Sequence, residues 1–414
     1  MIKPAEQKEY KPIIIGSGPA GIAAALRLSQ LGIKHTLIDK DDFPRDKICG
    51  DALSGKVLNA LKRTFPAIYI ELQSDAAALA THGISFIAPS GVKTDLPFRK
   101  KDDPRTDPTG FISKRLDFDY LLFKHIDPAF TQFIKAEVAD VIIEEEKVIV
   151  LDKSKKIVTE GSIIISAEGA RSLLAKKYTQ YHKDPNHYCA GLRQYYSGVS
   201  DLHSENYIEL HFIDALQPGY FWIFPLPNGE ANVGLGMLTS AVSKNKLNLT
   251  ELFDQIITTH PAISKRFKNA KPLEKVKGWA LPLGSKKRQI CNNRLLLTGD
   301  AASLIDPFTG EGIANAIISG IKAAEWTHKA HLEDNFNHSF LIGYEKELYS
   351  KIWQELKMSR QLQKVSHIKP LFNWVVNRAN TNDYFKDTLI DMFNQTDLRK
   401  KLFNPVFYFR LLFK

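Results

Sequence analysis

The sequence predicts an α/β protein with three parts: a parallel-sheet domain assembled from separated segments, an inserted antiparallel-sheet domain, and a C-terminal helical segment. Three observations predict this fold. A glycine-rich strand–turn–helix unit opens the chain, a second strand and glycine-rich turn follow near residue 300, and strands with hairpin turns lie between them. At 414 residues the chain exceeds the size at which a single core stops growing, so two or three domains are expected.

The composition is that of an ordinary globular protein, with 44% hydrophobic and 25% charged residues. Three scattered cysteines, Cys49, Cys189 and Cys291, are too few for a disulfide framework or a zinc site, so no metal is expected and a reducing cytoplasm is the expected location. The opening MIKPAEQKEY has no apolar core, and no apolar run approaches the roughly 18 residues of a membrane span.

The net charge of +10 favours contact with anionic surfaces. No zinc finger, basic zipper or aromatic RNA-binding motif is present, so nucleic acid is not an expected partner. Peripheral contact with the inner face of the membrane is the favoured interpretation of the charge.

The chain begins with a β-branched strand at residues 13–15 and an Ala- and Leu-rich helix that runs to about Leu31. The turn between them has glycines at G-x-G-x-x-G spacing: Gly16, Gly18 and Gly21. One glycine permits the tight turn, one lets backbone N–H groups approach a pyrophosphate, and one lets helix and strand pack closely. The helix N-terminus adds unpaired N–H donors, so this unit predicts a Rossmann-like dinucleotide site.

A second strand, residues 35–38, ends at Asp39. This is the position at which a carboxylate accepts a hydrogen bond from a ribose 2′-OH in such units. We therefore expect Asp39 to contact the ribose of the dinucleotide.

The stretch RLLLTGDAASLIDPFTGEGIANAIISGIKAAEW (294–326) predicts a strand, a Gly-Asp loop, a glycine-rich turn and a helix. It resembles the second signature of FAD enzymes with the p-hydroxybenzoate hydroxylase type of fold. The resemblance implies FAD as cofactor, with Asp300 bonded to its ribityl chain and Gly299, Gly310 and Gly312 in the turns beside it. The helix near Gly312 would point its N-terminus at the flavin pyrimidine edge, where a reduced flavin carries negative charge.

The stretch IIISAEGARSLL (163–174) lies between these two units, with Glu168-Gly169 where that family usually has Asp-Gly. A structural role for Glu168 is the preferred interpretation, and a role towards NAD(P)H is left open. No second glycine fingerprint of this quality occurs. An external electron donor, NAD(P)H or another, would therefore have to dock transiently.

The order of these signatures predicts a discontinuous FAD-binding domain with insertions. The predicted segments are 1–80, 113–185 and 286–332 for the FAD-binding domain, 81–112 and 186–285 for the substrate-binding domain, and 333–414 for the C-terminal helical region.

The stretch DDFPRDKICGDALSG (41–55) predicts a loop followed by a helix from about Ala52. Arg45 adds positive charge near the expected pyrophosphate. Cys49 would lie at the helix entrance, where thiols tend to have a lowered pKa. The alternative is that Cys49 is a small packing residue beside the cofactor.

The stretch PGYFWIFP (218–225) is apolar on both faces of a strand. Tyr220, Trp222 and Phe224 share one face, while Phe221 and Ile223 share the other. NGEANVGLGM (228–237) turns the chain and returns an antiparallel partner, with Gly234 and Gly236 on one face to leave room for a ring or ligand. The rings could line a pocket for a large apolar ligand, or all five side chains could be core.

These two stretches together resemble the geranylgeranyl reductase family over residues 11–330. That family has a cysteine-glycine beside the flavin, as in Lys47-Ile48-Cys49-Gly50, and a Tyr-x-Trp-x-Phe-Pro stretch followed by Gly-x-Gly. The resemblance implies that the three rings form the wall of a substrate pocket over the flavin and that Cys49 is a proton source or a switch in flavin position. Arg115 resembles an arginine that this fold turns towards FAD, and an ordinary surface arginine is the alternative.

The favoured function is an FAD-dependent oxidoreductase that reduces carbon–carbon double bonds of a lipophilic polyprenyl (isoprenoid) substrate. An FAD monooxygenase on the same fold is the first alternative. A flavin halogenase is disfavoured because residues 64–92 contain no lysine to carry a hypohalous species. A non-catalytic lipid or flavin carrier is a further alternative, disfavoured by intact cofactor signatures.

The C-terminal region has helical periodicity at residues 338–365, 371–379 and 383–393. Residues 336–414 contain 13 Lys or Arg and 7 Asp or Glu, and the chain ends in NPVFYFRLLFK. Contact with a bilayer interface and a cap over the pocket are both consistent with this pattern.

Overall fold

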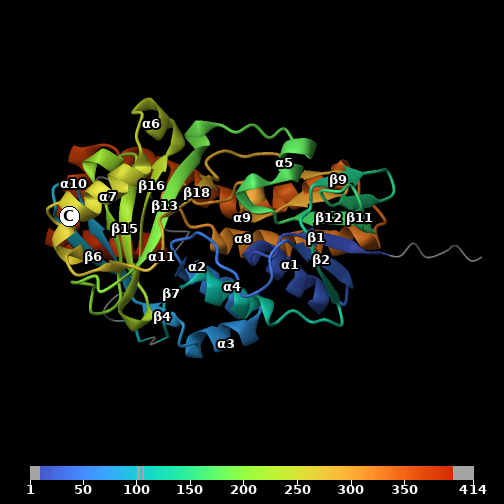
Figure 1. The fold of residues 1–414 in the computed structure, drawn as a ribbon, viewed down its shortest axis with the longest axis horizontal. Coiled ribbons are helices and arrows are strands. Elements are labelled where there is room, and N and C mark those ends of the chain that lie inside the picture. The colour runs from blue at the N-terminus through green and yellow to red at the C-terminus, as the bar shows by residue number, and fades with distance from the viewer. Residues whose placement is uncertain (1–9, 100–102, 105–106, 395–414) are drawn as a thin grey trace, which may run out of the picture.

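The computed structural model describes residues 10–99, 103–104 and 107–394. Two sheets stand at opposite ends of the molecule's long axis, and the long helices α8 and α9 run between them (Figure 1). This arrangement confirms the predicted fold class, with one correction. The larger sheet is mostly antiparallel, but β14 and β5 pair in parallel within it.

The first sheet has the order β19-β20-β12-β1-β2-β8 within the described residues, and all its pairs except the edge pair β19–β20 are parallel. Every residue of β1 and β12 is buried, as expected for parallel strands covered on both faces. The strands are β1 (Pro12–Ile15), β2 (His35–Asp39), β8 (Thr131–Lys135), β12 (Ile163–Ser166), β19 (Cys291–Asn292) and β20 (Leu295–Leu297).

Helices α1 (Pro19–Gln30) and α8 (Ile313–Leu332) pack tightly together beside this sheet. A Cβ on Gly320 would lie 2.1 Å from the Ala20 carbonyl oxygen, so a glycine is needed at this contact. A small side sheet of β9 (Asp140–Ile143), β10 (Val148–Leu151) and β11 (Ile157–Gly161) and helix α5 (Leu173–Tyr178) complete this half.

The larger sheet has the order β17-β13-β16-β15-β14-β5-β6, and β18 also pairs with β13. Helices α6 (Thr239–Lys244) and α7 (Leu249–Thr259) follow β16. The strands are β5 (Gly83–Ile87), β6 (Lys93–Pro97), β13 (Tyr188–Ser197), β14 (Ile208–His211), β15 (Gly219–Pro225), β16 (Glu230–Leu238), β17 (Lys271–Pro272) and β18 (Lys277–Pro282).

A third, three-stranded sheet corrects one prediction. The helix expected from about Ala52 begins instead at Gly55, because residues 52–53 form strand β3, which pairs with β7. The elements here are β3 (Ala52–Leu53), β4 (Ala78–Thr81), β7 (Gly110–Ser113), α2 (Gly55–Thr64), α3 (Pro66–Ser74) and α4 (Arg115–Phe123).

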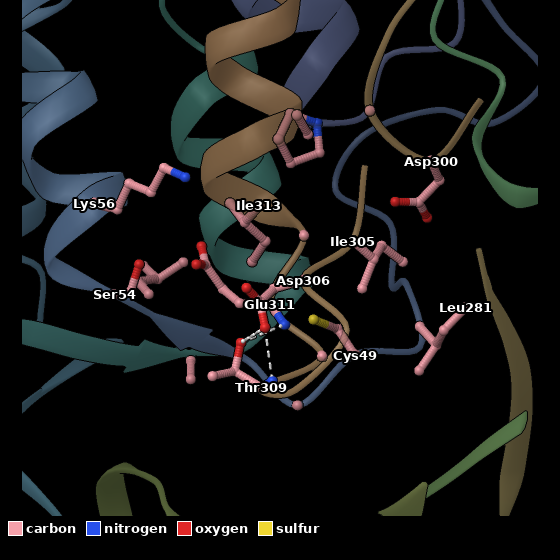
Figure 2. A pocket seen from close by; sticks show the side chains of 18 of the residues that line it. Cys49, Ser54, Lys56, Leu281, Asp300, Ile305, Asp306, Thr309, Glu311 and Ile313 are labelled. Atoms are coloured by element: carbon pink, nitrogen blue, oxygen red, sulfur yellow. Dashed lines mark hydrogen bonds between the residues drawn. The ribbon is translucent and has the colours of Figure 1, made fainter. Parts of the chain in front are cut away.

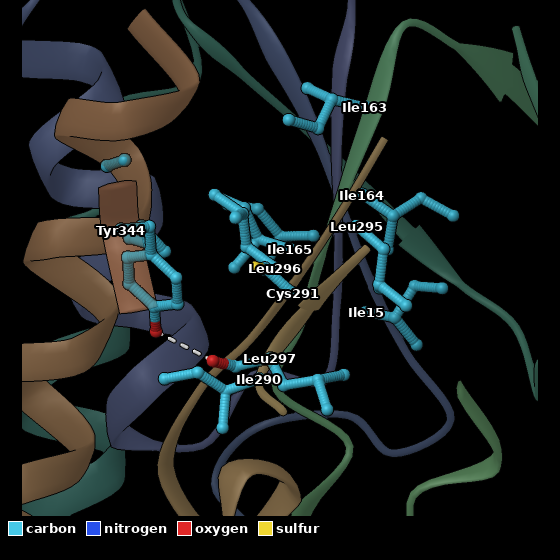
Figure 3. Close-up of a cluster of buried hydrophobic side chains, with 14 of the residues drawn as sticks. Ile15, Ile163, Ile164, Ile165, Ile290, Cys291, Leu295, Leu296, Leu297 and Tyr344 are labelled. Carbon is cyan, nitrogen blue, oxygen red and sulfur yellow. Dashed lines mark hydrogen bonds between the residues drawn. The ribbon is translucent and has the colours of Figure 1, made fainter. Parts of the chain in front are cut away.

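The C-terminal helices α9 (His338–Val365), α10 (Lys369–Thr381) and α11 (Asp383–Asn394) form where helical periodicity predicts them. Helix α9 packs on the parallel sheet, where the Tyr344 hydroxyl donates to the Leu297 carbonyl at 2.7 Å among buried Ile and Leu side chains (Figure 3). Helix α10 packs on the larger sheet, with the Phe372 ring 4.4 Å from that of Phe212. The segment NPVFYFRLLFK, for which contact with a bilayer or the pocket was considered, lies outside the described residues. The domain boundaries stay predictions.

Short 3-10 helices occupy several of the connections. They are η1 (Gly169–Arg171), η2 (Pro185–His187), η3 (Asp214–Leu216), η4 (Pro227–Gly229), η5 (Ser264–Phe267) and η6 (Gly299–Ala302). The predicted turn at Asn228-Gly229 is η4, and it joins β15 to its antiparallel partner β16.

Candidate active site

One cavity of about 2180 Å³ lies between the two large sheets and the C-terminal helices. This volume is more than twice the upper end of the usual range for small-molecule sites, about 1,000 Å³, so it can hold a dinucleotide and a second ligand together. All the site residues named from the sequence line it, with the exception of Gly21. Figure 2 shows Cys49, Asp300, Ile305 and Ile313 around one open space.

The first glycine turn forms a cradle that is open on one side. Gly16 has φ +97°, and a Cβ there would lie 2.3 Å from the Ala167 carbonyl oxygen. Gly21 does not line the cavity, because it packs against the backbone of Gly16. A Cβ at this position would lie 1.8 Å from the Gly16 carbonyl oxygen, so only a glycine fits. A Cβ on Gly18 would meet nothing within 4 Å. Gly18 also caps α1 without a side-chain hydrogen bond, so the free N–H groups of this helix fit a pyrophosphate.

Asp39 and Arg45 flank this cradle and are both tied to Ser17. The Asp39 carboxylate accepts from the Ser17 backbone N–H at 2.7 Å and from its hydroxyl at 2.6 Å. Arg45 donates to the Ser17 carbonyl at 3.0 Å and to Asp119 at 3.2 Å. Both side chains therefore hold the turn while lining the cavity, and the contact of Asp39 with a ribose stays a prediction.

The second glycine-rich segment faces the same cavity. Gly299 has φ +54° at the start of η6, and the turn before α8 contains Gly310 with φ +72°. Helix α8 begins after Gly312, and its first turn faces the cavity, where the Glu311 carboxylate accepts from the Ala314 N–H at 3.1 Å. The N-terminus of α1 has no side-chain cap, whereas Glu311 caps α8, so α1 offers the freer N–H groups to an anionic cofactor. The donor sets of both turns fit FAD.

Glu168 has a structural use. Its carboxylate accepts from the hydroxyls of Ser166 and Ser172, both at 2.7 Å, and from the N–H groups of Leu173 and Leu174 at 3.0 and 3.3 Å. These bonds fasten the loop after β12 to the first turn of α5, which supports the structural interpretation of this residue.

The loop that carries Cys49 is bound to the larger sheet by polar contacts. Asp46 pairs with Arg193 at 2.9 Å and with Lys277 at 3.0 Å. The Asn232 side-chain amide donates to the Cys49 carbonyl at 2.8 Å. The position of the thiol is therefore set by β13, β16 and β18, and not by the FAD-binding half alone.

Asn232 links this loop to the ring-bearing strand. Its amide also donates to Asp51 at 2.8 Å, and its carbonyl accepts from the Trp222 indole N–H at 2.8 Å. The Tyr195 hydroxyl donates to the same Asp51 carboxylate at 2.7 Å. Sequence reasoning missed these residues. Strand alternation could have found Asn232, because it shares a face with Gly234 and pairs with Phe224 in the register, but Tyr195 and Asp51 have no comparable signal.

Burial controls the acid–base properties of this loop. Burial raises the pKa of the Cys49 thiol, and the Arg115 guanidinium opposes this only in part. The predicted lowering of the Cys49 pKa is therefore wrong, because no helix starts at Cys49 and the loop is enclosed. Burial also raises the pKa of Asp51 to about 6, against hydrogen bonds from Tyr195 and Asn232 that lower it.

Arg115 lies in the interior, so the alternative of a surface arginine is wrong: it is 6% exposed. Its guanidinium makes two bonds to the buried Asp119 carboxylate, at 2.6 and 2.7 Å. The charge of the same guanidinium lowers the pKa of Cys49, and Arg115 lines the cavity. A direct contact of Arg115 with the cofactor stays a prediction.

Strand β15 presents its two faces to different surroundings. Tyr220, Trp222 and Phe224 line the cavity, although Trp222 and Phe224 are also buried members of a core cluster, while Phe221 and Ile223 lie in a separate core cluster, so the substrate-binding role of the three rings stays a prediction. A Cβ on Gly234 would lie 2.2 Å from the Trp222 ring, which confirms that this glycine makes room for a ring.

The rings begin an apolar arm of the cavity that runs away from the glycine turns. Strands β5 and β14 form one side of this arm, and helix α9 forms another. Its lining includes Ile84, Phe86, Leu210, Phe212, Met358 and Leu362.

The described residues contain no helix long and apolar enough to cross a bilayer. Within the same residues, no group of His, Cys, Asp or Glu side chains is arranged to hold a metal ion.

Comparisons with known proteins agree with this geometry. The model of the geranylgeranyl reductase catalytic domain matches residues 189–279, and the model of an FAD binding domain matches residues 9–64. The chain is 26% identical to the digeranylgeranylglycerophospholipid reductase of Thermoplasma volcanium, over 93% of this chain and 92% of the relative.

Two solved structures share the fold. A geranylgeranyl bacteriochlorophyll reductase-like protein from Thermoplasma acidophilum superposes with a TM-score of 0.77 at 22% identity, over 97% of this chain and 98% of the other. A flavin-dependent brominase superposes with a TM-score of 0.73 at 21% identity, over 93% of each chain.

The segment matched by the catalytic-domain model contains the ring-bearing strand β15, and the segment matched by the FAD binding domain model contains the first glycine turn. The glycine cradle and the match to the FAD binding domain model agree on one cofactor, FAD. Over most of its length the chain is similar to geranylgeranyl reductases, and we identify it as an FAD-dependent oxidoreductase of that type.

Proposed function

We propose that this enzyme reduces carbon–carbon double bonds of a polyprenyl lipid. The single observation that carries the proposal is the continuity of the cavity, in which the glycine cradle and the ring-lined apolar arm form one space with Cys49 at their junction. An isolated alkene has no polar group to polarise, so its reduction depends on positioning and exclusion of water. An apolar arm with buried walls provides both.

The roles of the residues follow from their places. The turns at Gly16–Gly18 and Gly299–Gly312 would hold FAD, which when reduced supplies the hydride for one alkene carbon. Tyr220, Trp222 and Phe224 would hold the prenyl chain over the cofactor by apolar contact. Cys49 would donate the proton that the other carbon needs, and its raised pKa keeps the thiol protonated for this purpose.

Two groups beside Cys49 would stabilise the thiolate that proton donation leaves, although burial and the charge of Asp51 oppose it. The Arg115 guanidinium and the Asp51 backbone N–H both favour that charge. A proton from solvent would then restore the thiol, so that one hydride and one proton are consumed for each double bond. The electron donor is external in this proposal, because the family models assign one nucleotide-binding domain to the chain.

A halogenase on the same fold is not favoured by the cavity. Lys56 of α2 lines it, but its ammonium donates to Glu355 at 2.7 Å and to Asn315 at 2.8 Å. These bonds hold the amine against α8 and α9, so it is not available to carry a hypohalous species.

The decisive experiment mixes the dithionite-reduced holoprotein with geranylgeranyl lipids under nitrogen and measures product mass. We expect a gain of two hydrogens for each reduced bond. A yellow, fully reducible holoprotein that changes the mass of no prenyl lipid would refute the proposal. Oxygen or halide incorporated in air would instead identify the monooxygenase or halogenase alternative.

A further inference from the structure

The surface of helix α10 divides into three stripes. Phe372, Val376 and Ala379 face the larger sheet and are buried. On one side of them lie three asparagines at helical spacing, Asn373, Asn377 and Asn380. On the other side lie Leu371 and Trp374, and this side continues the exposed residues Val365 and Ile368 at the end of α9. We call Val365, Ile368, Leu371 and Trp374 the outer flank.

The asparagine side of α10 has partners in the protein. Asn373 accepts from the Ser90 backbone N–H at 3.3 Å, and Asn380 donates to the Lys93 carbonyl at 2.8 Å. These bonds fix the rotation of the helix about its axis. The rotation leaves the outer flank facing away from the sheet, with Ile368 52% exposed and Trp374 39% exposed, and the Trp374 ring packs edge-on against Phe385 of α11 at 5.7 Å.

Exposed apolar residues in such a group need a reason, because monomeric soluble proteins seldom gather them on one helix side. The sequence around them is rich in basic residues, although Lys369 is paired with Asp214 at 2.9 Å. Between Leu356 and Asn382 the chain has five cationic side chains and no Asp or Glu: Lys357, Arg360, Lys364, Lys369 and Arg378. Apolar side chains with a Trp, bordered by cations, are the composition of a surface that lies in the interface of an anionic bilayer.

The outer flank also lies at one end of the substrate cavity. The last turns of α9 present Leu362, Ser366 and His367 to the cavity, while Val365 and Ile368 of the same segment face outwards. The cavity reaches the exposed Asp387 of α11 at this end. The apolar arm that starts at the rings of β15 therefore ends beside the apolar surface patch.

We propose that the outer flank docks on an anionic phospholipid bilayer and brings this end of the cavity to the lipid. A prenyl lipid could then pass from the bilayer into the apolar arm without its chain crossing water, a transfer that costs about 0.8 kcal/mol for each methylene exposed. The prenyl lipid as substrate rests on the proposed function, but binding of the protein to vesicles is measured without any reaction.

The test is flotation of the full-length holoprotein with vesicles of phosphatidylcholine, with and without phosphatidylglycerol. We expect binding to the anionic vesicles, weakened at least about tenfold in the double variant Leu371→Ser/Trp374→Ser. The control is Asn377→Ser, an exposed polar position one turn along the same helix from Trp374, which should bind as the wild type does. Lys364→Gln and Arg378→Gln should each weaken binding about fivefold.

Two outcomes would overturn docking by the outer flank. One is that the Leu371→Ser/Trp374→Ser variant floats as well as the wild type. The other is that the wild type floats only while residues 395–414 are present and the double variant has no effect, which would assign the contact to that segment.

Reduction of a detergent-dispersed prenyl lipid separates this proposal from the proposed function. We expect equal rates in the wild type and the double variant there, because neither substituted residue lines the cavity. The wild type and the variants could show the expected differences in vesicle binding while none of them reduces the prenyl lipid. That result would refute the proposed function and leave the docking proposal standing.

Discussion

The cofactor half and the substrate half of the cavity differ in how much of their lining is backbone and how much is side chain. In the cofactor half the glycine turns leave backbone open to the space, and the Asp39 and Arg45 side chains line it beside them. In the substrate half the walls are side chains, and their positions depend on polar bonds that cross between distant segments, such as Asn232 to Asp51. The shape of a glycine turn is determined by a few neighbouring residues. The positions of the side chains in the substrate half depend instead on contacts between segments that are distant in the sequence.

The largest effect should come from filling the open space at the first glycine turn. Gly18→Leu places a side chain in open space, since a Cβ there meets nothing within 4 Å, so the protein should fold while the side chain occupies the pyrophosphate position. Two lost hydrogen bonds to a charged group, at about 1.5–3 kcal/mol each, predict FAD binding weaker by at least about 100-fold.

Flavin absorbance after gel filtration and FAD titration of the apoprotein measure this effect. Circular dichroism separates it from unfolding, and Gly91→Leu is the matched control. Gly91 also has open space around its Cβ and lies in a turn away from the cavity, although its φ of +82° adds local strain. FAD bound by Gly18→Leu with wild-type affinity would contradict a pyrophosphate site at this turn.

The second effect should come from the junction between the halves. Cys49→Ala removes the proposed proton donor, and the loss of general acid catalysis predicts a fall in kcat of about 10²–10⁴. FAD content should stay unchanged, because the cradle does not involve the thiol. Rapid-reaction reoxidation of the reduced enzyme by substrate measures the step.

Cys189→Ala is the control for the loss of a cavity-lining thiol elsewhere in the same space. Wild-type reoxidation rates in Cys49→Ala would show that the proton comes from another group. Cys49→Ser should recover part of the rate, because a hydroxyl also carries a proton to the same place.

A smaller effect should appear in the pH dependence of stability. Asp51 has a pKa near 4 in an unfolded chain and about 6 in the folded protein. Between these values the folded state binds more protons than the unfolded state, so the free energy of unfolding should fall as pH rises from about 4 to 6, by about 3 kcal/mol, and then level off. Asp51→Asn should remove this fall.

Urea unfolding of both proteins at pH 4, 5, 6 and 7 gives the two curves. The difference between them is the quantity to compare, because all other titrating groups are shared. Parallel curves would show that Asp51 does not keep its proton in the folded state.

The contrast between the glycine turns and the side-chain lining also explains what the sequence could predict. The G-x-G-x-x-G turn is local, and its glycines have the steric reasons that the spacing implies. The two faces of β15 were predictable for the same reason, since alternation along a strand is local. The start of α2 was not, because residues 52–53 pair with β7 some sixty positions away and so cannot join the helix.

The acid–base state of Cys49 was predicted wrongly for a related reason. Its pKa depends on enclosure by Arg115, Asp51 and the larger sheet, and this enclosure comes from segments up to 183 positions distant, as in the bond from Asn232. Local sequence suggested a helix end and therefore a thiolate. Tertiary burial raises the pKa and keeps the thiol.

The smallest effect should come from Tyr220, where the two halves of the cavity meet. Its hydroxyl donates to the Thr309 carbonyl in the turn before α8, and a Cβ on Gly310 would lie 3.0 Å from that hydroxyl. Tyr220→Phe keeps the ring but removes the one bond that ties β15 to this turn. We expect about 1 kcal/mol of lost stability, the usual net value of one hydrogen bond, and a KM for the prenyl lipid raised less than tenfold with kcat unchanged. Tyr220→Leu, which also removes the ring, should raise KM further. Equal KM values in the two variants would show that the hydroxyl, and not the ring, is what the substrate half needs from this residue.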